Sequence, residues 1–426
     1  MRNEKQILEN NVKEISKIIF GDSELHISVF SKEESIEYSE SQFDFLCEIE
    51  LLEKKIEQEQ IGKLSKFLNK EVQQTSRKIF WFVGANGRTI KSIKKLKSKE
   101  LQKDITLPKF IDDYIFNKLN ASFAPNFKKF NKNLNHKKGD VLIYIGTYFP
   151  RSFAETYSIF NNIIQNEIIE KSYQEQEEIN ILDIGSGTGG NLSGLLLSLI
   201  ENISKKANFN IVAVDGNKEA LKFLEKIVFH IQLKYNLNIS LNCHYVAFET
   251  ITDLYENSKQ FFEPNFDFII SSKMINEIIT KDRDSYFNFY NHFAKYLNNE
   301  GLLLMLDVTK KIEVDYMPIL LNKQTNRFIQ ENKGTYKTLI PTSCAKFDSI
   351  CKQDCFSNNH FVVTHSKKKN DRTKVTYRII GKSKFVNLIL SKIDNIGNVI
   401  GWDNIGNQKY CYFISSTSNT QSAYKI

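Results

Sequence analysis

The sequence predicts an α/β protein built on a doubly wound, Rossmann-like parallel sheet, with a helical N-terminal region and a small C-terminal β region. Three observations predict this fold. A glycine-rich turn at residues 185–190 separates an apolar strand from an apolar helix. Strand and helix patterns then alternate up to residue 309, as in a parallel sheet covered on both faces. A carboxylate, Asp215, ends the second strand, about 25 residues after the turn.

Length and composition indicate several domains. The chain has 426 residues, more than one domain usually holds, and 41% of them are hydrophobic. We expect a helical, locally basic region at 1–140, a cofactor-binding core at 141–342, and a cysteine-bearing segment with a small β region at 343–426. The net charge of +8 favours a polyanionic partner, but a composition rich in Lys, Asn and Ile also follows from genomic base composition, so local clusters are more informative.

The N-terminus carries no targeting signal. Residues 1–19 mix acids and bases and lack both the apolar stretch of a signal peptide and the Arg-rich character of a transit peptide. No apolar run approaches membrane-spanning length. Six cysteines without a secretory signal argue against a disulfide framework. These features predict a cytoplasmic protein with no membrane partner.

The N-terminal region combines helical patterns with basic clusters. Apolar residues recur at helical spacing in 7–19 and 45–67. Lysines gather in 91–103 and 127–138, which indicates either solvated helix faces or a phosphate-binding surface. The stretch Gly84–Gly87 and the residues after it resemble the GxxG loop of a KH module, which clamps single-stranded RNA, although a simple turn after a strand gives the same pattern.

The core begins with an apolar stretch from Val141. Residues 148–157 read as a helix start, with Pro150 tolerated in the first turn, and 171–178 read as a polar linker. The apolar run 192–200 reads as the helix after the glycine turn. The predicted strands are 179–184, 210–215, 239–246, 266–272 and 301–309.

The glycine turn predicts a ligand at the N-terminus of the helix that follows. Gly185, Gly187 and Gly190 also satisfy the dinucleotide spacing GxGxxG, so the glycines alone do not decide the cofactor. Asp183 helps to decide it, because a carboxylate there is badly placed beside a pyrophosphate but suits the amino group and positive charge of S-adenosylmethionine. A purely structural glycine turn is the alternative.

The other candidate cofactor contacts follow the later strands. Asp215 is placed to accept hydrogen bonds from both ribose hydroxyls, and Gly216 and Asn217 pass close to the adenine. Phe248 or Glu249 would pack on the adenine or bond its amino group. The predicted cofactor-binding set is Asp183, Gly185, Ser186, Gly187, Gly189, Asp215, Gly216, Asn217, Phe248 and Ser271.

The turn after the fourth strand gives weaker information about catalysis. Residues 271–277 lack the Asn/Asp-Pro-Pro-aromatic turn of base-amino methyltransferases, and no Pro-Cys pair supplies a nucleophile for carbon-5 pyrimidine methylation. Lys273 or Glu277 has the chemistry of a general base, and a surface ion pair is an equal interpretation. No catalytic residue is assigned.

A cysteine cluster lies in the C-terminal part of the chain. Residues 336–341 and 360–365, or 375–380, predict an antiparallel hairpin that closes the sheet. Cys344, Cys351 and Cys355 lie between them, and thiolates gathered this closely in a reduced compartment suggest zinc or an iron–sulfur cluster. Cys411, on a predicted strand at 409–415 after the turn-rich 395–407, is the best fourth ligand, and His360 is second. Unliganded buried cysteines are the alternative.

Taken in order, these segments resemble the class I S-adenosylmethionine-dependent methyltransferases, and among them the methyltransferase-like ribosomal small-subunit (Rsm-type) proteins of mitochondria and bacteria. The resemblance covers about residues 140–415. It rests on the helix entry 148–157, the cofactor loop 181–191, and the cysteine segment 341–356 followed by Tyr377 and Arg378. In the cysteine segment, Ser343, Lys352 and Asp354 replace the prolines and aromatic residues usual in the family.

The resemblance implies a function and a ligand set. Cys344, Cys351, Cys355 and Cys411 would ligate a [4Fe–4S] cluster, with zinc as the alternative. The protein would bind S-adenosylmethionine and act on the small ribosomal subunit or its RNA, as an RNA methyltransferase or as a non-catalytic assembly factor. A methyltransferase for a protein or a small molecule is a further alternative.

Overall fold

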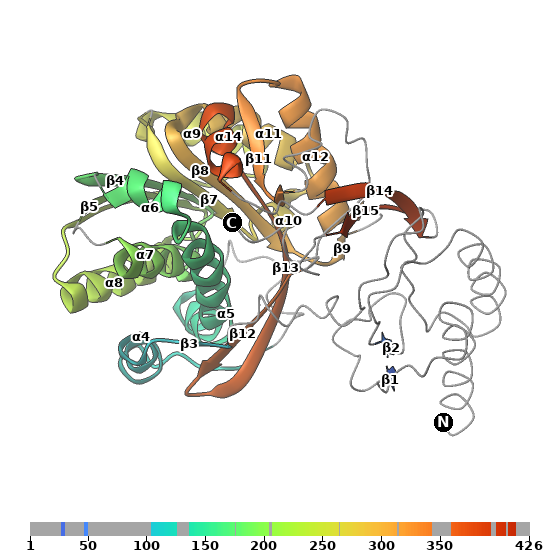
Figure 1. Cartoon of the computed structure of the whole chain (residues 1–426). Coiled ribbons are helices and arrows are strands. Elements are labelled where there is room, and N and C mark those ends of the chain that lie inside the picture. Colours follow the sequence, from blue (N-terminus) through green and yellow to red (C-terminus); the bar gives the residue numbers. More distant parts are fainter. Residues whose placement is uncertain are drawn as a thin grey trace. The chain divides into compact units, whose positions relative to one another are not determined.

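The computed structural model of the protein describes residues 104–125, 136–174, 176–203, 207–263, 265–312, 315–342 and 359–392. It also describes the backbone of the short strands β1 (Ile27–Val29), β2 (Cys47–Ile49), β14 (Asn398–Ile405) and β15 (Gln408–Ile414). The sheet and the site belong to the compact unit that contains residues 100–398 (Figure 1).

Within the described part of the chain, nine strands form one sheet. Their order is β3, β12, β13, β8, β7, β4, β5 and β6, and β11 also pairs with β13. Five neighbours, β8 to β6 in that order, run parallel, whereas β13 is antiparallel to β8. The bounds are β3 (Asp104–Thr106), β4 (Glu178–Ile184), β5 (Asn208–Asp215), β6 (Ile239–Tyr245), β7 (Phe266–Ser272), β8 (Leu297–Val308), β11 (Tyr336–Ile340), β12 (Asn359–His365) and β13 (Lys368–Lys382).

The order in which strands are added to the sheet reverses at β4. Strands β5 and β6 are added on one side of β4 and β7 and β8 on the other, which is the doubly wound arrangement that the sequence predicts. The predicted fourth strand matches β7 at both ends. β8 begins at Leu297, before the predicted Gly301, and its register with β7 shifts between Phe266 and Phe268. Of the two predicted closing hairpins, the one between 336–341 and 375–380 is confirmed, since β11 pairs antiparallel with β13. β12 also pairs with β13 rather than with β11, so the alternative hairpin between 336–341 and 360–365 is wrong.

Helices cover both faces of this sheet (Figure 1). Alternate residues of a strand face opposite layers, so Ile181 and Ile270 pack in one core and Leu182 and Ile269 in the other. The first core is covered by α5 (Lys138–Ile164), α6 (Glu167–Gln174), α7 (Gly190–Asn202), α8 (Lys218–Tyr235) and α14 (Ser383–Ser391). The second is covered by α9 (Ile251–Ser258), α10 (Ile275–Ile278), α11 (Ser285–Phe293) and α12 (Met317–Glu331).

Residues 104–125, which the sequence analysis counts with the N-terminal region, pack on this core. β3 pairs parallel with β12 at the edge of the sheet. The helices that follow, α4 (Lys109–Asp113) and η3 (Tyr114–Lys118), bury Ile111, Ile115 and Phe116 in a third cluster with α5 and α8. The predicted domain boundaries near 140 and 342 stay predictions.

The predicted helix start at Tyr148 is wrong. Helix α5 begins at Lys138, so Pro150 lies inside the helix rather than in its first turn. An interior proline costs a helix about 3 kcal/mol, because it removes one backbone hydrogen bond. Burial of Val141, Ile145, Phe149 and Phe153, spaced four residues apart, offsets that cost.

Three further local predictions need correction. The predicted linker 171–178 begins as the last turn of α6, which ends at Gln174. The turn-rich segment 395–407 contains β14, which forms a two-stranded sheet with β15. β2 lies inside the predicted helical stretch 45–67, where Cys47, Glu48 and Ile49 alternate as in a strand, and it pairs with β1.

The other N-terminal predictions lie outside the described residues. They are the helix 7–19, the remainder of 45–67, the lysine-rich stretch 91–103, most of the lysine-rich stretch 127–138, and the KH-like loop Gly84–Gly87. None of the helices in the described part of the chain is long and apolar enough to cross a membrane.

Candidate functional site

A cavity opens at the carboxyl ends of β4, β5 and β7, where ligands bind in open α/β sheets. The empty space in it, which includes open solvent at the mouth, is about 640 Å³. Its lining joins the glycine turn after β4, the residues after β5 and β7, and the first turns of α5. The lining residues are His136, Val141, Tyr144, Gly185, Gly187, Thr188, Asp215, Gly216, Asn217, Ala220, Phe248, Ser272, Lys273, Met274, Glu277 and Ile278.

The turn after β4 requires glycine at three positions. Gly185, Gly187 and Gly189 have φ angles of +73°, +52° and +80°, which residues with a side chain rarely adopt. At Gly185 a Cβ atom would also lie 2.7 Å from the Cβ atom of Met274. Gly189 is the N-cap of α7, so the turn brings the N-terminus of that helix to the cavity.

Asp215, the last residue of β5, is held in place by two backbone amides. Gly187 N donates to its Oδ2 atom at 2.8 Å, and Asn217 N donates to its Oδ1 atom at 2.8 Å. Burial raises the pKa of this carboxyl group to about 6, although the two amides partly oppose the shift. Each oxygen keeps lone pairs for a further donor, and the residue lines the cavity.

Asp183 is buried directly behind the glycine turn. Asp183 is 1% exposed, and its Oδ2 atom has no hydrogen-bond partner. Burial, and then the nearby charge of Asp215, raise the pKa of Asp183 well above its usual range. A buried carboxylate oxygen without a donor is costly for the protein, so a ligand donor that reached it would be bound strongly.

The residues after β5 and β6 shape the adjacent wall. Asn217 caps α8, because its Oδ1 atom accepts hydrogen bonds from Glu219 N at 2.9 Å and Ala220 N at 3.0 Å. Phe248 is 7% exposed and contributes an apolar surface to the cavity. Glu249 instead forms an exposed ion pair with Lys281 at 2.5 Å.

The structure brings most of the predicted cofactor residues together. Gly185, Gly187, Asp215, Gly216, Asn217 and Phe248 line the cavity. Asp183, Ser186, Gly189 and Ser271 lie outside the lining. Ser186 donates to Val214 O at 3.4 Å, and Ser271 is 1% exposed with no partner for its Oγ atom. As ligand contacts, all ten stay predictions.

The turn after β7 gives Lys273 an unusual backbone conformation. Its φ angle is +58°, a region that a lysine rarely adopts. The conformation is held by neighbouring groups, since Lys273 N donates to Leu306 O at 2.8 Å and Asn276 Nδ2 donates to Lys273 O at 2.5 Å. Such strain persists only where the surrounding structure over-determines it, and it gathers at functional sites.

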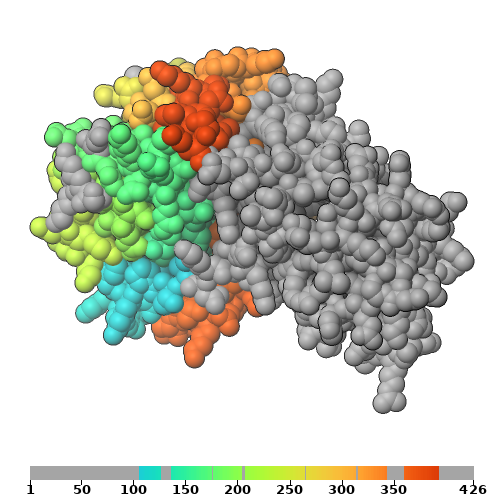
Figure 2. Space-filling model, viewed as in Figure 1, coloured from blue at the N-terminus to red at the C-terminus, as the bar shows by residue number. Residues whose placement is uncertain are grey.

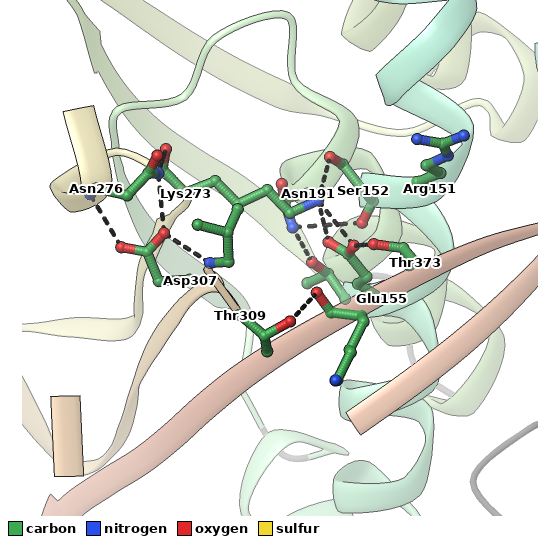
Figure 3. Close-up of polar contacts among 12 residues, drawn as sticks. Arg151, Ser152, Glu155, Asn191, Lys273, Asn276, Asp307, Thr309 and Thr373 are labelled. Atoms are coloured by element: carbon green, nitrogen blue, oxygen red, sulfur yellow. Dashed lines mark hydrogen bonds and ion pairs between the residues drawn. The ribbon is translucent and has the colours of Figure 1, made fainter. Parts of the chain in front are cut away.

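That conformation directs the lysine side chain towards α5 (Figure 3). Lys273 Nζ donates to Glu155 Oε1 at 2.7 Å and to Ser152 Oγ at 3.3 Å. Glu155 Oε1 also accepts from Thr373 Oγ1 of β13 at 2.6 Å. Glu155 is fully buried, and the ammonium group of Lys273 compensates its charge. This network ties α5 and β13 to the cavity wall.

A second buried carboxylate, Asp307 of β8, orders the same turn (Figure 3). It accepts hydrogen bonds from Asn276 N at 3.0 Å, Asn276 Nδ2 at 2.9 Å and Tyr286 OH at 2.8 Å. Burial raises the pKa of Asp307, and these donors oppose the shift. The turn after β7 is therefore fixed from two sides.

Tyr144 of α5 and His136, just before this helix, form the opposite wall, and Tyr148 packs behind Tyr144. The ring centroids of Tyr144 and Tyr148 are 4.9 Å apart, and those of His136 and Tyr144 are 6.4 Å apart. Burial, followed by the charges of Glu277 and Asp215, raises the pKa of Tyr144, so its hydroxyl group stays protonated at neutral pH. Sequence reasoning did not find Glu155, Tyr144 or His136, because only the fold brings them to the cavity.

The described residues do not test the predicted metal site. Cys344, Cys351 and Cys355 lie outside the described residues, as does the side chain of Cys411, whose backbone lies in β15. His360 lies on β12, where burial and then Lys374 lower its pKa to about 4. Among the described side chains, no group of three His, Cys, Asp or Glu residues is arranged to hold a metal ion.

Comparison with known proteins finds similarity at the level of solved structures. No protein-family model and no curated protein matches the sequence. The plantazolicin methyltransferase BpumL, solved with S-adenosylhomocysteine, is 14% identical over 67% of this chain and 98% of its own, with a TM-score of 0.32. An S-adenosylmethionine-dependent methyltransferase described as putative, from Methanococcus maripaludis, is 15% identical over 62% and 98%, with a TM-score of 0.29. The human methyltransferase 10 domain containing protein is 13% identical over 53% and 81%, with a TM-score of 0.30.

Proposed function

We propose that this protein binds S-adenosylmethionine at the carboxyl ends of β4 and β5 and transfers its methyl group. The observation that carries the proposal is the position of Asp215. Its carboxylate ends the second strand, lines the cavity and accepts from the backbone of the glycine turn at 2.8 Å. In doubly wound folds an acidic residue at this place bonds the ribose hydroxyls of an adenosine ligand.

The residues present fit this cofactor. The orphaned Oδ2 atom of Asp183 would accept a hydrogen bond from an ammonium group, which S-adenosylmethionine has and a nicotinamide dinucleotide lacks. The Asp215 carboxylate, which is ionised at neutral pH, would repel a pyrophosphate group held at the same turn. Phe248 would pack on the adenine. When bound, S-adenosylmethionine supplies an electrophilic methyl group at its sulfonium centre.

The other half of the cavity is the proposed acceptor site. Lys273, Glu277 and Tyr144 line it. The Lys273 ammonium is engaged by Glu155, and a protonated amine has no lone pair with which to accept a proton. Glu277 is therefore the better candidate for a general base, and Lys273 would orient the acceptor. Positioning of the acceptor in line with the methyl group supplies most of the rate in such a displacement.

The acceptor is proposed from the sequence. The resemblance to the ribosomal small-subunit methyltransferase-like proteins favours the small subunit or its RNA as the partner. The same resemblance favours a [4Fe–4S] cluster, or zinc, at Cys344, Cys351, Cys355 and Cys411. Non-catalytic ribosome assembly and methylation of a protein or small molecule are the competing functions.

Methyl transfer from labelled S-adenosylmethionine tests the proposal. Purified protein is incubated with the labelled cofactor and with small ribosomal subunits, total RNA or a soluble protein fraction. We expect label in the RNA, and none with Asp215→Ala. Label in the protein fraction instead of the RNA would show that the acceptor is a protein. Cosedimentation with small subunits without transfer, unaffected by Asp215→Ala, would favour the assembly factor. Lack of both transfer and cofactor binding would refute the function.

A further inference from the structure

The hairpin of β12 and β13 extends past β8, and we call this part of the hairpin the ribbon; β3 pairs with its β12 strand at residues 362–364. β13 pairs with β8 only over residues 375–381, whereas β12 pairs with β13 over residues 368–375. Ser366 and Lys367 form the turn at the tip, because His365 pairs with Lys368. Figure 2 shows this part of the chain (orange) at the surface beside residues 104–125 (cyan).

The ribbon carries a concentrated positive charge. Its basic residues are Lys367, Lys368, Lys369, Arg372 and Lys374, and Asp371 is the single acid in the same stretch. Residues 366–370 and Arg372 are exposed. We name the exposed cations Lys367, Lys368, Lys369 and Arg372 the ribbon cluster.

The one acid of this stretch neutralises only part of the cluster. Asp371 is fully buried, and the Nε and Nη2 atoms of Arg151 donate to its two oxygens at 2.8 and 2.7 Å. Lys368 approaches the same carboxylate at 2.9 Å. The carboxylate therefore has two cationic partners. Burial alone would raise the pKa of Asp371, but the interactions with His365, Arg151 and Lys368 together hold it below its usual range. A net positive charge is left at the base of the tip.

Aromatic rings order two of the lysines. Lys367 Nζ lies 5.6 Å from the ring centroid of Phe116, and Lys368 Nζ lies 5.7 Å from that of Phe123. His365 is fully buried between these rings, at centroid distances of 5.4 and 5.5 Å. Lysines held this way lose less conformational freedom when they contact an anion.

The ribbon leads from its tip towards the cavity. Lys369 and Thr373 are four residues apart on one strand, which corresponds to about 13 Å. Thr373 bonds Glu155 at 2.6 Å, and Glu155 bonds Lys273 of the cavity wall at 2.7 Å. About four stacked nucleotides span the length of that strand segment, at ~3.4 Å each. Tyr144 and Tyr148, beside the cavity, offer rings on which bases can stack.

We propose that the ribbon cluster binds the phosphate backbone of a single-stranded polynucleotide and guides one nucleotide into the cavity. The guiding role rests on the proposed methyl transfer, whereas the phosphate contacts do not. A single strand fits because a base must leave a duplex before it can enter a cavity. The tip, Ser366 to Asn370, has no apolar side chain to insert into a lipid bilayer, so a membrane surface fits it less well.

Fluorescence anisotropy with the full-length protein tests the proposal. The probe is a labelled 20-nucleotide RNA of mixed sequence, measured at 50 and 200 mM KCl. We expect Lys367→Glu/Lys369→Glu to weaken binding about 10- to 100-fold and to flatten the salt dependence, because each lost phosphate contact removes part of the counterion release. The matched control is Lys384→Glu/Lys392→Glu, an exposed lysine of α14 and its exposed C-cap lysine, at the other end of β13. This control should bind the probe as the wild type does.

Each outcome is decisive. Wild-type affinity in the ribbon variant, equal weakening in the α14 control, or tighter binding of a matching RNA duplex would each overturn the proposal. A matching single-stranded DNA shows whether the ribbon distinguishes the two sugars. S-Adenosylhomocysteine binding, measured on the same variants by calorimetry, should be unchanged. If the wild-type protein binds RNA but not S-adenosylhomocysteine, the proposed methyl transfer is refuted, whereas the proposed phosphate contacts of the ribbon are not.

Discussion

Lys273 Nζ lies 2.7 Å from the carboxylate of Glu155, a residue 118 positions earlier in the chain whose side chain has no exposed surface. This ion pair joins the strained turn after β7 to the middle of α5. It fixes one wall of the cavity, and it gives the buried carboxylate of α5 a cationic partner.

Removing the charge of Glu155 should destabilise the protein. In Glu155→Gln the ammonium of Lys273, which is 17% exposed, loses its counter-ion, and we expect a loss of about 3 kcal/mol in the free energy of unfolding. Urea denaturation measures it. Glu256→Gln, which breaks the exposed pair with Lys259, is the matched control and should leave stability unchanged.

A double variant separates the ion pair from packing. Glu155→Gln/Lys273→Met removes both charges and should recover part of the stability lost in Glu155→Gln, since no buried charge is left unpaired. If the single and double variants are equally stable, or if Glu155→Gln matches the wild type, the pair does not fix the wall.

Asp183→Asn should stabilise the ligand-free protein while weakening cofactor binding. The folded state raises the pKa of this carboxyl above its unfolded value, so the folded protein binds the proton more tightly. The contribution of this carboxyl group to the free energy of unfolding is therefore highest at acidic pH. It falls as the pH rises from the usual carboxyl range through the pKa that Asp183 has in the folded protein. We expect a higher melting temperature for Asp183→Asn at pH 8 and a smaller loss of stability between pH 5 and 8. Weaker binding of S-adenosylhomocysteine should accompany both. A lower melting temperature together with unchanged affinity would contradict this role.

Cofactor affinity should fall at acidic pH because of Asp215. Its pKa of about 6 means that the ionised form, which accepts hydrogen bonds from ribose hydroxyls, is lost as the pH falls through 6. At pH 5 about a tenth of the ligand-free protein carries the charge, so affinity for S-adenosylhomocysteine should be about tenfold weaker than at pH 7.5. Calorimetry at the two pH values measures this ratio. Equal affinities would exclude Asp215 as the ionised contact.

Gly194→Ala should disrupt the packing of α7 on α5. A Cβ atom at Gly194 would lie 2.4 Å from Phe153 O and 2.8 Å from Tyr157 N, both backbone atoms that cannot move alone. We expect a loss of about 3 kcal/mol in the free energy of unfolding. Gly139→Ala, in the first turn of α5 with no atom within 4 Å of the new Cβ, should instead gain up to about 1 kcal/mol. Thermal denaturation of the two variants should therefore shift in opposite directions.

The order of strands and helices in the core was predictable from the sequence because each signal is local. The buried strand 266–272 and the glycine turn each carry their pattern within about ten residues. The start of α5 was not predictable, because Pro150 is a strong local signal for a helix start. Only the burial of residues on both sides of it shows that the helix continues. Tertiary packing there overrides propensity.

The candidate site was predictable on the cofactor side and not on the acceptor side. Asp183 and Asp215 are identified by their position at strand ends, which the sequence reveals. Glu155, Tyr144 and Thr373 become functional candidates only because α5 and β13 lie beside the turn after β7. The basic ribbon escaped notice for the same reason, since its significance depends on a hairpin that extends past β8.

Isothermal titration of the full-length protein with S-adenosylhomocysteine tests the central claim most directly. The account predicts one molecule bound per chain, and loss of that heat in Asp215→Ala, while the Lys384→Glu/Lys392→Glu control binds normally. Absence of heat with S-adenosylhomocysteine and S-adenosylmethionine, together with binding of a nicotinamide dinucleotide, would contradict it.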